Sequence, residues 1–226
     1  MKKYYINITN HCNRKCPFCC MYSLPENNRF MDFDDFYGLL NDLDGDTIIQ
    51  LEGGEPTLHP QFALFLEYAC SLKAVSKVVI DTNGTTINDV LSVITEAAAR
   101  NKKTVEVKVS YNDFLRRHDP RLSSIIRDTY FATEFLEYIS VSANVRGISD
   151  YELKCLSEEL GNIPMTCYLF NDYGRATANG YDLPPLRVKQ IFDQWACIAT
   201  DGTDFGTDLI ARSEYELSLI KKEQRV

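Results

Sequence analysis

Long hydrophobic runs and an excess of positive charge are both missing from this sequence of 226 residues. Its longest apolar runs are far shorter than the ~20 residues that a membrane-spanning helix needs. Met1-Lys2-Lys3 resembles the start of a signal peptide, but residues 4–11 are too polar to form its apolar core. The formal net charge of −8 argues against a nucleic-acid-binding surface, which is normally basic. We therefore expect a cytoplasmic protein that binds neither nucleic acid nor membrane.

Internal repeats and low-complexity linkers are also missing. The length allows one sizeable core, or at most two small domains. The composition, 45% hydrophobic and 25% charged, is ordinary for a globular protein. In a cytoplasmic protein the 8 cysteines are better interpreted as metal ligands and small buried residues than as disulfides.

Strand-like and helix-like segments alternate along the chain. Because six βα units in series predict a parallel sheet with helices outside it, we expect an α/β fold. Six units fall short of the eight in a closed TIM barrel. The prediction is a partial (β/α)6 TIM-like barrel with a short C-terminal extension, divided into residues 1–180 and 181–226. Strands are predicted at 3–9, 47–51, 77–80, 104–110, 138–145 and 165–170, and helices at 32–43, 62–72, 90–100, 122–134, 150–160 and 185–195.

Unusual sequences gather where these strands end. In such sheets ligands bind at the carboxyl ends of the strands, so the clustering predicts a single site on one rim. The segments are the cysteine loop after the first strand, Gly53-Gly54-Glu55-Pro56, Thr82-Asn83-Gly84, Ser110, Asn144 and Gly174-Arg175.

Three cysteines near the start, Cys12, Cys16 and Cys19, have the spacing C-x3-C-x2-C. Three thiolates grouped this tightly can hold three irons of an iron–sulfur cube and leave the fourth open, whereas a fully ligated cluster mainly carries electrons. An incompletely ligated metal can bind a substrate directly. Zinc, with His11 or Cys20 as fourth ligand, is the alternative. Zinc motifs usually have a second ligand pair, and no second C-x2-C or H-x3-H occurs here.

With these motifs in this order, residues 4–180 resemble the radical S-adenosylmethionine (radical SAM) enzymes. The specific signals are the aromatic residue before the last cysteine (Phe18-Cys19) and Gly-Gly-Glu-Pro at the end of the next strand. The resemblance implies that the three cysteines hold a 4Fe–4S cluster whose open iron chelates SAM. It implies that Gly53, Gly54 and Glu55 approach the methionine amino group, and that the backbone of Phe18 lies near the adenine.

Other implied SAM contacts rest on shorter matches. Ser110 resembles a strand-end serine that contacts SAM, and Arg121, in His118-Asp119-Pro120-Arg121, resembles an arginine that binds its carboxylate. Asn83 and Asn144 are candidates for the ribose or the carboxylate, but asparagine is also common in turns. Arg121 would serve equally well as an exposed loop residue. Gly174-Arg175-Ala176 resembles a turn of peptide-modifying members, or is a plain strand-terminating turn.

The resemblance implies an enzyme in which a reduced cluster cleaves SAM to methionine and a 5′-deoxyadenosyl radical that abstracts hydrogen from a substrate. An external reductant such as flavodoxin or ferredoxin is then expected. A peptide is the first expectation for the substrate. The alternatives are a small molecule, as in nucleotide or cofactor biosynthesis, or a partner protein in which a glycyl radical is installed. A non-enzymatic zinc or iron–sulfur module is the fourth hypothesis. Candidate acids or bases at the rim are Asp113, Glu52 and Tyr173, and no catalytic residue is assigned.

The match is incomplete at the C-terminus. Trp195-Ala196-Cys197 followed by Asp201-Gly202 resembles the opening of a SPASM or twitch segment, which holds auxiliary clusters, but no cysteine follows Cys197. A complete auxiliary site of that type is therefore not expected. The chain starts at its first strand, so no leader-binding domain is expected either, and the tail after Asp201 is a candidate final helix or partner contact. Structural roles are expected for most remaining cysteines, although a second cluster is left open: Cys20, Cys70, Cys155, Cys167 and Cys197.

Overall fold

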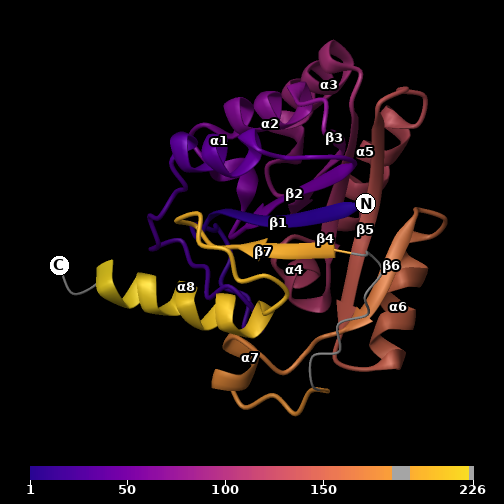
Figure 1. Cartoon of the computed structure of the whole chain (residues 1–226). Coiled ribbons are helices and arrows are strands. Elements are labelled where there is room, and N and C mark those ends of the chain that lie inside the picture. The colour runs from indigo at the N-terminus through magenta and orange to yellow at the C-terminus, as the bar shows by residue number, and fades with distance from the viewer. Residues whose placement is uncertain (185–193, 224–226) are drawn as a thin grey trace.

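A computed structural model describes residues 1–184 and 194–223 (Figure 1). Seven strands form one sheet in which every neighbouring pair is parallel, in the order β6-β5-β4-β3-β2-β1-β7. The sheet is a half-barrel, which confirms the predicted α/β fold. Its strands are β1 (Lys2–Thr9), β2 (Thr47–Gly53), β3 (Val75–Thr82), β4 (Thr104–Tyr111), β5 (Ile139–Gly147), β6 (Met165–Leu169) and β7 (Gln194–Ile198).

The helices that connect the strands from β1 to β6 cover the outer face of the sheet, and each of the predicted helices up to residue 160 is confirmed. Ser149 caps the last of these helices, because its hydroxyl accepts a hydrogen bond from the N–H of Glu152 at 3.2 Å. The helices are α1 (Phe33–Asn41), α2 (Phe62–Ser71), α3 (Ile87–Asn101), α4 (Asp113–His118), α5 (Leu122–Thr133), α6 (Asp150–Leu160), α7 (Arg175–Ala178) and α8 (Leu209–Glu223), with a short 3-10 turn, η1 (Pro56–Leu58).

Alternation along the strands separates the two faces of the sheet. In β4 the side chains of Val105, Val107 and Val109 are buried in the core against the helices. Glu106 and Lys108, between them, face the concave side, where they are half-buried. The concave face therefore carries polar and charged side chains rather than a closed apolar barrel core.

The seventh strand corrects the prediction of a last helix at 185–195. Residues 185–193 lie outside the described part of the chain, but Gln194 and Trp195 belong to β7, which pairs with β1. A short apolar run such as Trp195–Ile198 cannot be assigned to helix or strand by periodicity. The free edge of β1 makes this segment a strand, because its backbone N–H and C=O groups can pair with all five residues of β7. The boundary at residue 180 stays a prediction.

The tail after Asp201 forms α8, as expected, and docks against the barrel through buried polar side chains. Figure 1 shows this helix beside β1 and β7, on the other side of the sheet from α1, α2 and α3. Glu216 accepts a hydrogen bond from Asn7 at 2.7 Å and two from Thr200. Arg212 forms an ion pair with Glu52 at 2.8 Å. Among the described residues, none of the helices is both long and apolar enough to cross a membrane.

The end of β2 meets the end of β1 through very close backbone contacts. The N–H of Gly54 donates to the carbonyl of Thr9 at 2.6 Å, and the next N–H, of Glu55, donates to the carbonyl of His11 at 2.9 Å. A Cβ on Gly53 would overlap the Thr9 carbonyl, and one on Gly54 would overlap the His11 carbonyl. Both positions therefore require glycine.

Gly54→Ala is predicted to destabilise the protein by about 2–3 kcal/mol, because the added methyl must displace backbone rather than a flexible side chain. Gly38→Ala is the matched control: Gly38 lies inside α1 with open space around it. This control should stabilise the helix by about 0.5–1 kcal/mol. Urea unfolding of the three proteins measures both effects, and equal free energies of unfolding for Gly54→Ala and wild type would contradict the first.

Candidate active site

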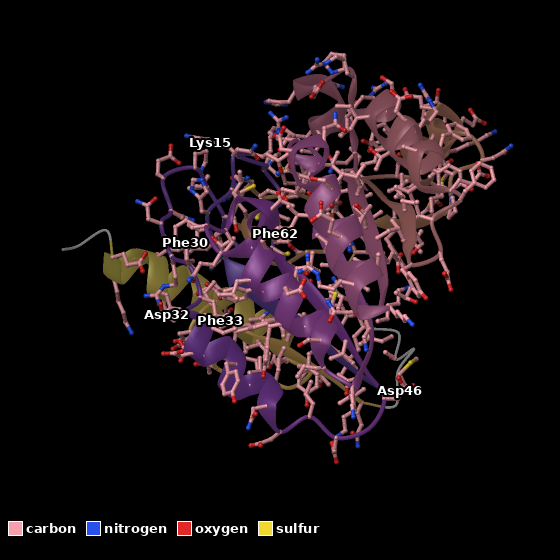
Figure 2. The ribbon with its side chains drawn as sticks, turned by 90° about the horizontal axis from the view of Figure 1, so that it is seen from above. Lys15, Phe30, Asp32, Phe33, Asp46 and Phe62 are labelled. Carbon is pink, nitrogen blue, oxygen red and sulfur yellow. The ribbon has the colours of Figure 1, made fainter. Side chains whose placement is uncertain are left out.

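One open cavity lies at the carboxyl ends of the strands, as the sequence predicted. The empty volume of the cavity is about 1040 Å³, which includes space open to solvent. Figure 2 shows Lys15, in the cysteine loop, at the upper left and Asp46, just before β2, at the lower right. The lining combines the cysteine loop with the ends of five strands: Cys12, Arg14, Cys16, Phe18, Cys19, Cys20, Met21, Ser23, Glu52, Gly53, Gly54, Asp81, Thr82, Asn83, Ser110, Asn112, Leu115, Asn144, Arg146, Phe170, Asn171 and Tyr173.

The three motif cysteines, Cys12, Cys16 and Cys19, all line this cavity as free thiols. Burial raises the pKa of Cys12 to about 12 and also raises that of Cys16, so positive charge from a bound metal is needed to stabilise the thiolates. Among the described residues, no group of three or more potential ligands is arranged around a single metal ion. Three thiols that line one cavity are the ligand set for a 4Fe–4S cluster with one open iron.

Glu55 does not lie in the cavity lining. Its carboxylate is fully buried and accepts hydrogen bonds from Thr57 Oγ1 at 2.5 Å, Thr82 Oγ1 at 2.7 Å and the N–H of Asn83 at 2.7 Å. Burial raises its pKa, while these hydrogen bonds oppose the shift. The implied contact with an amino group therefore falls to Gly53 and Gly54, and Glu55 ties the ends of β2 and β3 together beneath them.

Asn83 lines the cavity but is held by the cysteine loop. Its Nδ2 donates to Asn13 Oδ1 at 3.0 Å and lies 3.7 Å from Cys12 Sγ. Its Oδ1 accepts two hydrogen bonds from Thr85. The side chain thus positions the first cysteine in addition to facing the cavity.

Three more predicted contacts meet at the cavity. Phe18 stacks on Phe170 with ring centroids 3.7 Å apart. Ser110 Oγ lies 3.4 Å from Asp81 Oδ1. Asn144 is 6% exposed, and its Oδ1 has no hydrogen-bond partner. The strand-end positions of the last two explain the convergence, because Ser110 and Asn144 are paired in the register of β4 and β5.

Arg121 lies outside the cavity, which corrects its implied role. Its side chain is 81% exposed and its Nε lies 3.4 Å from Asp119 on the surface. The candidate acid Asp113 is also outside, paired with Arg116 and Arg117 at 2.7 Å each. A sequence match cannot give the direction of a side chain: here Asp113, at the start of α4, and Arg121, just before α5, both pair with neighbours outside the cavity.

Two arginines that the sequence reasoning missed do line the cavity, Arg14 and Arg146. Arg14 lies between the first two motif cysteines, and Arg146 extends from β5 over the ring of Tyr168. The sequence did contain a signal for Arg146: it lies two residues after Asn144 and therefore points to the same face of the strand. Of the other two candidate acids or bases, Glu52 and Tyr173 both line the cavity.

Arg175 holds the cysteine loop in place through hydrogen bonds to backbone carbonyls of the loop. Its guanidinium donates to the carbonyls of Cys16 at 2.7 Å and Ser23 at 2.8 Å, and its N–H donates to the carbonyl of Cys19 at 2.9 Å. Gly174, at φ +66°, lies so close to Cys20 that a Cβ would contact its backbone. The Gly-Arg-Ala segment is therefore more than a strand-terminating turn: it holds the loop that carries the motif cysteines.

Of the five other cysteines, Cys20 alone lines the cavity. Cys70 and Cys197 are buried, on α2 and β7. Cys155 is half-buried on α6, and Cys167 is exposed on β6. These four lie on separate elements.

Comparison with known proteins identifies the family. The radical SAM superfamily matches residues 6–127, more than half of the sequence. The chain belongs to the radical SAM superfamily. Members of this superfamily are enzymes that use a 4Fe–4S cluster and SAM, and here the three cysteines fit the cluster, while the adjoining glycine turn and polar rim fit SAM.

Curated relatives match over a limited stretch. A GTP 3′,8-cyclase of Mannheimia succiniciproducens is 31% identical over 91 residues, which cover 37% of this chain and 27% of the cyclase. A protein of Pyrococcus furiosus that modifies the cofactor of tungsten-containing aldehyde ferredoxin oxidoreductase is 33% identical over 93 residues, 39% of this chain and 26% of that protein. The match thus spans about a quarter of the length of these relatives.

Solved structures share the fold. SuiB of Streptococcus suis, bound to the precursor peptide SuiA, superimposes with a TM-score of 0.53 at 16% identity, covering 75% of this chain and 39% of SuiB. The structure of anSMEcpe with bound AdoMet gives a TM-score of 0.55 at 17% identity, covering 85% of this chain and 54% of that one. At this identity the likeness establishes the half-barrel architecture.

Replacing the guanidinium that holds the cysteine loop tests its structural role. Arg175→Ala should retain less iron after anaerobic reconstitution and gel filtration, and should lower the free energy of unfolding by about 2–3 kcal/mol, because two charge-assisted hydrogen bonds are lost. Arg100→Ala, which removes an exposed arginine paired with Glu67 on the outer helices, is the control. Iron content and stability equal to those of the control would show that the loop does not depend on Arg175.

The cavity carboxyl Asp81 should make stability depend on pH. Burial, and then the neighbouring carboxylate Glu52, raise the pKa of Asp81 to about 6, against the opposing effect of Lys108 and Arg146. A carboxyl whose pKa is raised by folding stabilises the native state at low pH and loses this contribution as pH rises through its folded pKa.

Asp81→Asn mimics the protonated form. Its stability relative to wild type should therefore increase from about pH 4 to about pH 6 and stay level above about pH 7, by at most about 3 kcal/mol. Urea unfolding of the metal-free proteins at pH 4.5, 6 and 7.5 measures the difference. A difference that does not change with pH would contradict the raised pKa.

Proposed function

We propose that this protein is a radical SAM enzyme that abstracts hydrogen from a carbon of a peptide substrate. One observation supports it most directly: Cys12, Cys16 and Cys19 line the same cavity as Gly53 and Gly54, on the rim where parallel sheets bind ligands. When bound, the reduced cluster supplies the electron that cleaves SAM and so generates the radical.

The first tasks in the proposal are to hold the cluster, to fix the loop that carries its ligands, and to approach the ammonium of SAM. The motif cysteines hold three irons, and Arg175 and Asn83 fix the loop that carries them. Gly53 and Gly54 let backbone carbonyls approach an ammonium closely, because no side chain intervenes. The protein thereby positions the reacting groups, and the cofactors supply the difficult chemistry.

The remaining lining residues complete the site. Phe18 and its stacking partner Phe170 offer an apolar wall on which an adenine can lie. Ser110 and Asn112 offer polar groups for the ribose. In the same proposal Arg14 or Arg146 takes the role of carboxylate partner implied for Arg121, because both line the cavity.

A peptide is favoured as substrate by two features. The Gly174-Arg175-Ala176 segment resembles that of peptide-modifying members, and it packs directly against the cysteine loop. SuiB, which shares the fold, is known in complex with a precursor peptide. A small molecule is the second candidate, since GTP 3′,8-cyclases match at 30–31% identity. In both cases an external one-electron donor such as flavodoxin or ferredoxin is part of the proposal.

Loss of one motif thiol tests the function. The reconstituted wild type should hold about four iron and four sulfide per chain, because three thiolates and a cavity of this kind fit one 4Fe–4S cluster. With dithionite and SAM it should release 5′-deoxyadenosine. Cys16→Ala should reduce the nucleoside at least 100-fold, because an incompletely held cluster is lost.

Cys155→Ala, at a half-buried cysteine on α6, is the matched control and should behave as wild type. Bound zinc without nucleoside formation by the wild type would overturn the proposal. About eight iron per chain would instead show a second cluster, and nucleoside formation by Cys16→Ala would show that this cysteine is not a ligand.

A further inference from the structure

Two carboxylates line the cavity from adjacent strands, Glu52 on β2 and Asp81 on β3, and they differ in their partners. Glu52 is fully engaged: Oε1 is paired with Arg212 at 2.8 Å, and Oε2 accepts a hydrogen bond from Gln50 at 2.8 Å. Asp81 has one long contact, from Ser110 Oγ to its Oδ1 at 3.4 Å. In the described part of the chain nothing donates to its Oδ2, so Asp81 retains an open acceptor.

A second acceptor faces the same space. Asn144 is 6% exposed, lines the cavity, and leaves its Oδ1 without a partner. Through the register of β4 and β5 it lies directly beside Ser110, the residue that contacts Asp81. A carbonyl oxygen that lines a cavity and has no donor from the protein can accept a hydrogen bond from a ligand bound there.

Asp81 also lies deeper than Ser110, the strand-end residue proposed to contact SAM. In the strand register Asp81 is level with Lys108 and Ser142, whereas Ser110 is one inward-facing position nearer the rim, beside Asn144. A ligand at Asp81 is therefore on the inner side of the rim, between the SAM contacts and the concave face of the sheet.

We propose that Asp81 and Asn144 bind a protonated primary amine of the substrate. An ammonium carries three donors and no acceptor, which matches two acceptors that lack donors. Its positive charge also suits a carboxylate whose neighbour, Glu52, is already neutralised by Arg212. The inference rests on the proposed function and narrows it to a substrate with a lysine-like side chain.

Binding of an amine here should depend on the ionisation of Asp81, whose pKa burial raises to about 6. The charged and titratable groups around it are Glu52 from β2, Lys108 from β4, Arg146 from β5, Glu55, and Lys3 and Tyr5 from β1. An amine stays protonated throughout pH 5–8, since its ordinary pKa is about 10.4. Weaker binding below pH 6 is therefore expected from protonation of Asp81.

Equilibrium dialysis of the reconstituted protein with SAM, under anaerobic conditions, tests the inference. The probe is Nα-acetyl-L-lysine N-methylamide, and its Nε-acetylated form is the uncharged comparison. At pH 7.5 the wild type should bind the amine at least tenfold more tightly than the acetylated form. In the wild type the preference for the amine should disappear below pH 6. Asp81→Asn should bind the two probes equally at every pH. Asp89→Asn, at an exposed aspartate of α3, should show the same preference and the same pH dependence as the wild type.

Equal binding of the two probes by the wild type, or an unchanged preference in Asp81→Asn, would overturn the amine site. Labelled SAM in the same dialysis separates the other possibility: if Asp81→Asn loses SAM instead, Asp81 serves the cofactor and the inference is wrong. The proposed function would survive each of these results. It is tested independently by nucleoside formation in the wild type and in Cys16→Ala.

Discussion

The close backbone contact between the ends of β1 and β2 is the constraint on which the site depends. Two successive N–H groups, of Gly54 and Glu55, reach the carbonyls of Thr9 and His11, immediately before the first motif cysteine. Because neither Gly53 nor Gly54 has room for a Cβ, this close contact fixes the path of the chain as it leaves β1. The buried carboxylate of Glu55 then extends the same constraint to β3 through Thr82 and Asn83. One motif thus serves as scaffold and as cavity lining.

The regular part of the fold could be predicted because each strand is a short apolar run and each helix has its own periodicity. The strand ends could be predicted to converge because that follows from parallel topology. Two side-chain roles could not: the direction of Glu55 depends on the hydroxyls of Thr57 and Thr82, and Arg121 turns outward toward Asp119. Sequence motifs fix where a residue lies along the chain, whereas neighbouring donors and acceptors fix where it points.

Long-range partners explain what else the sequence left open. Arg175 reaches back 159 residues to the Cys16 carbonyl, and Glu216 reaches back 209 residues to Asn7. No local sequence pattern predicts either contact. An arginine that follows a glycine is ordinary, and so is a glutamate within a helix. Strand β7 was missed for a related reason, because its assignment depends on the free edge of β1. The positions of α7, β7 and α8 therefore depend on the surfaces that the first part of the chain presents.

These contacts also give the cavity its uneven charge. Arg212, carried by α8, neutralises Glu52 and leaves Asp81 as the carboxylate with a free oxygen. Glu52 still raises the pKa of Asp81, and without the ion pair to Arg212 the repulsion between the two carboxylates would be stronger. The C-terminal helix thereby contributes to the chemistry of the cavity through Glu52, although none of its residues lines it.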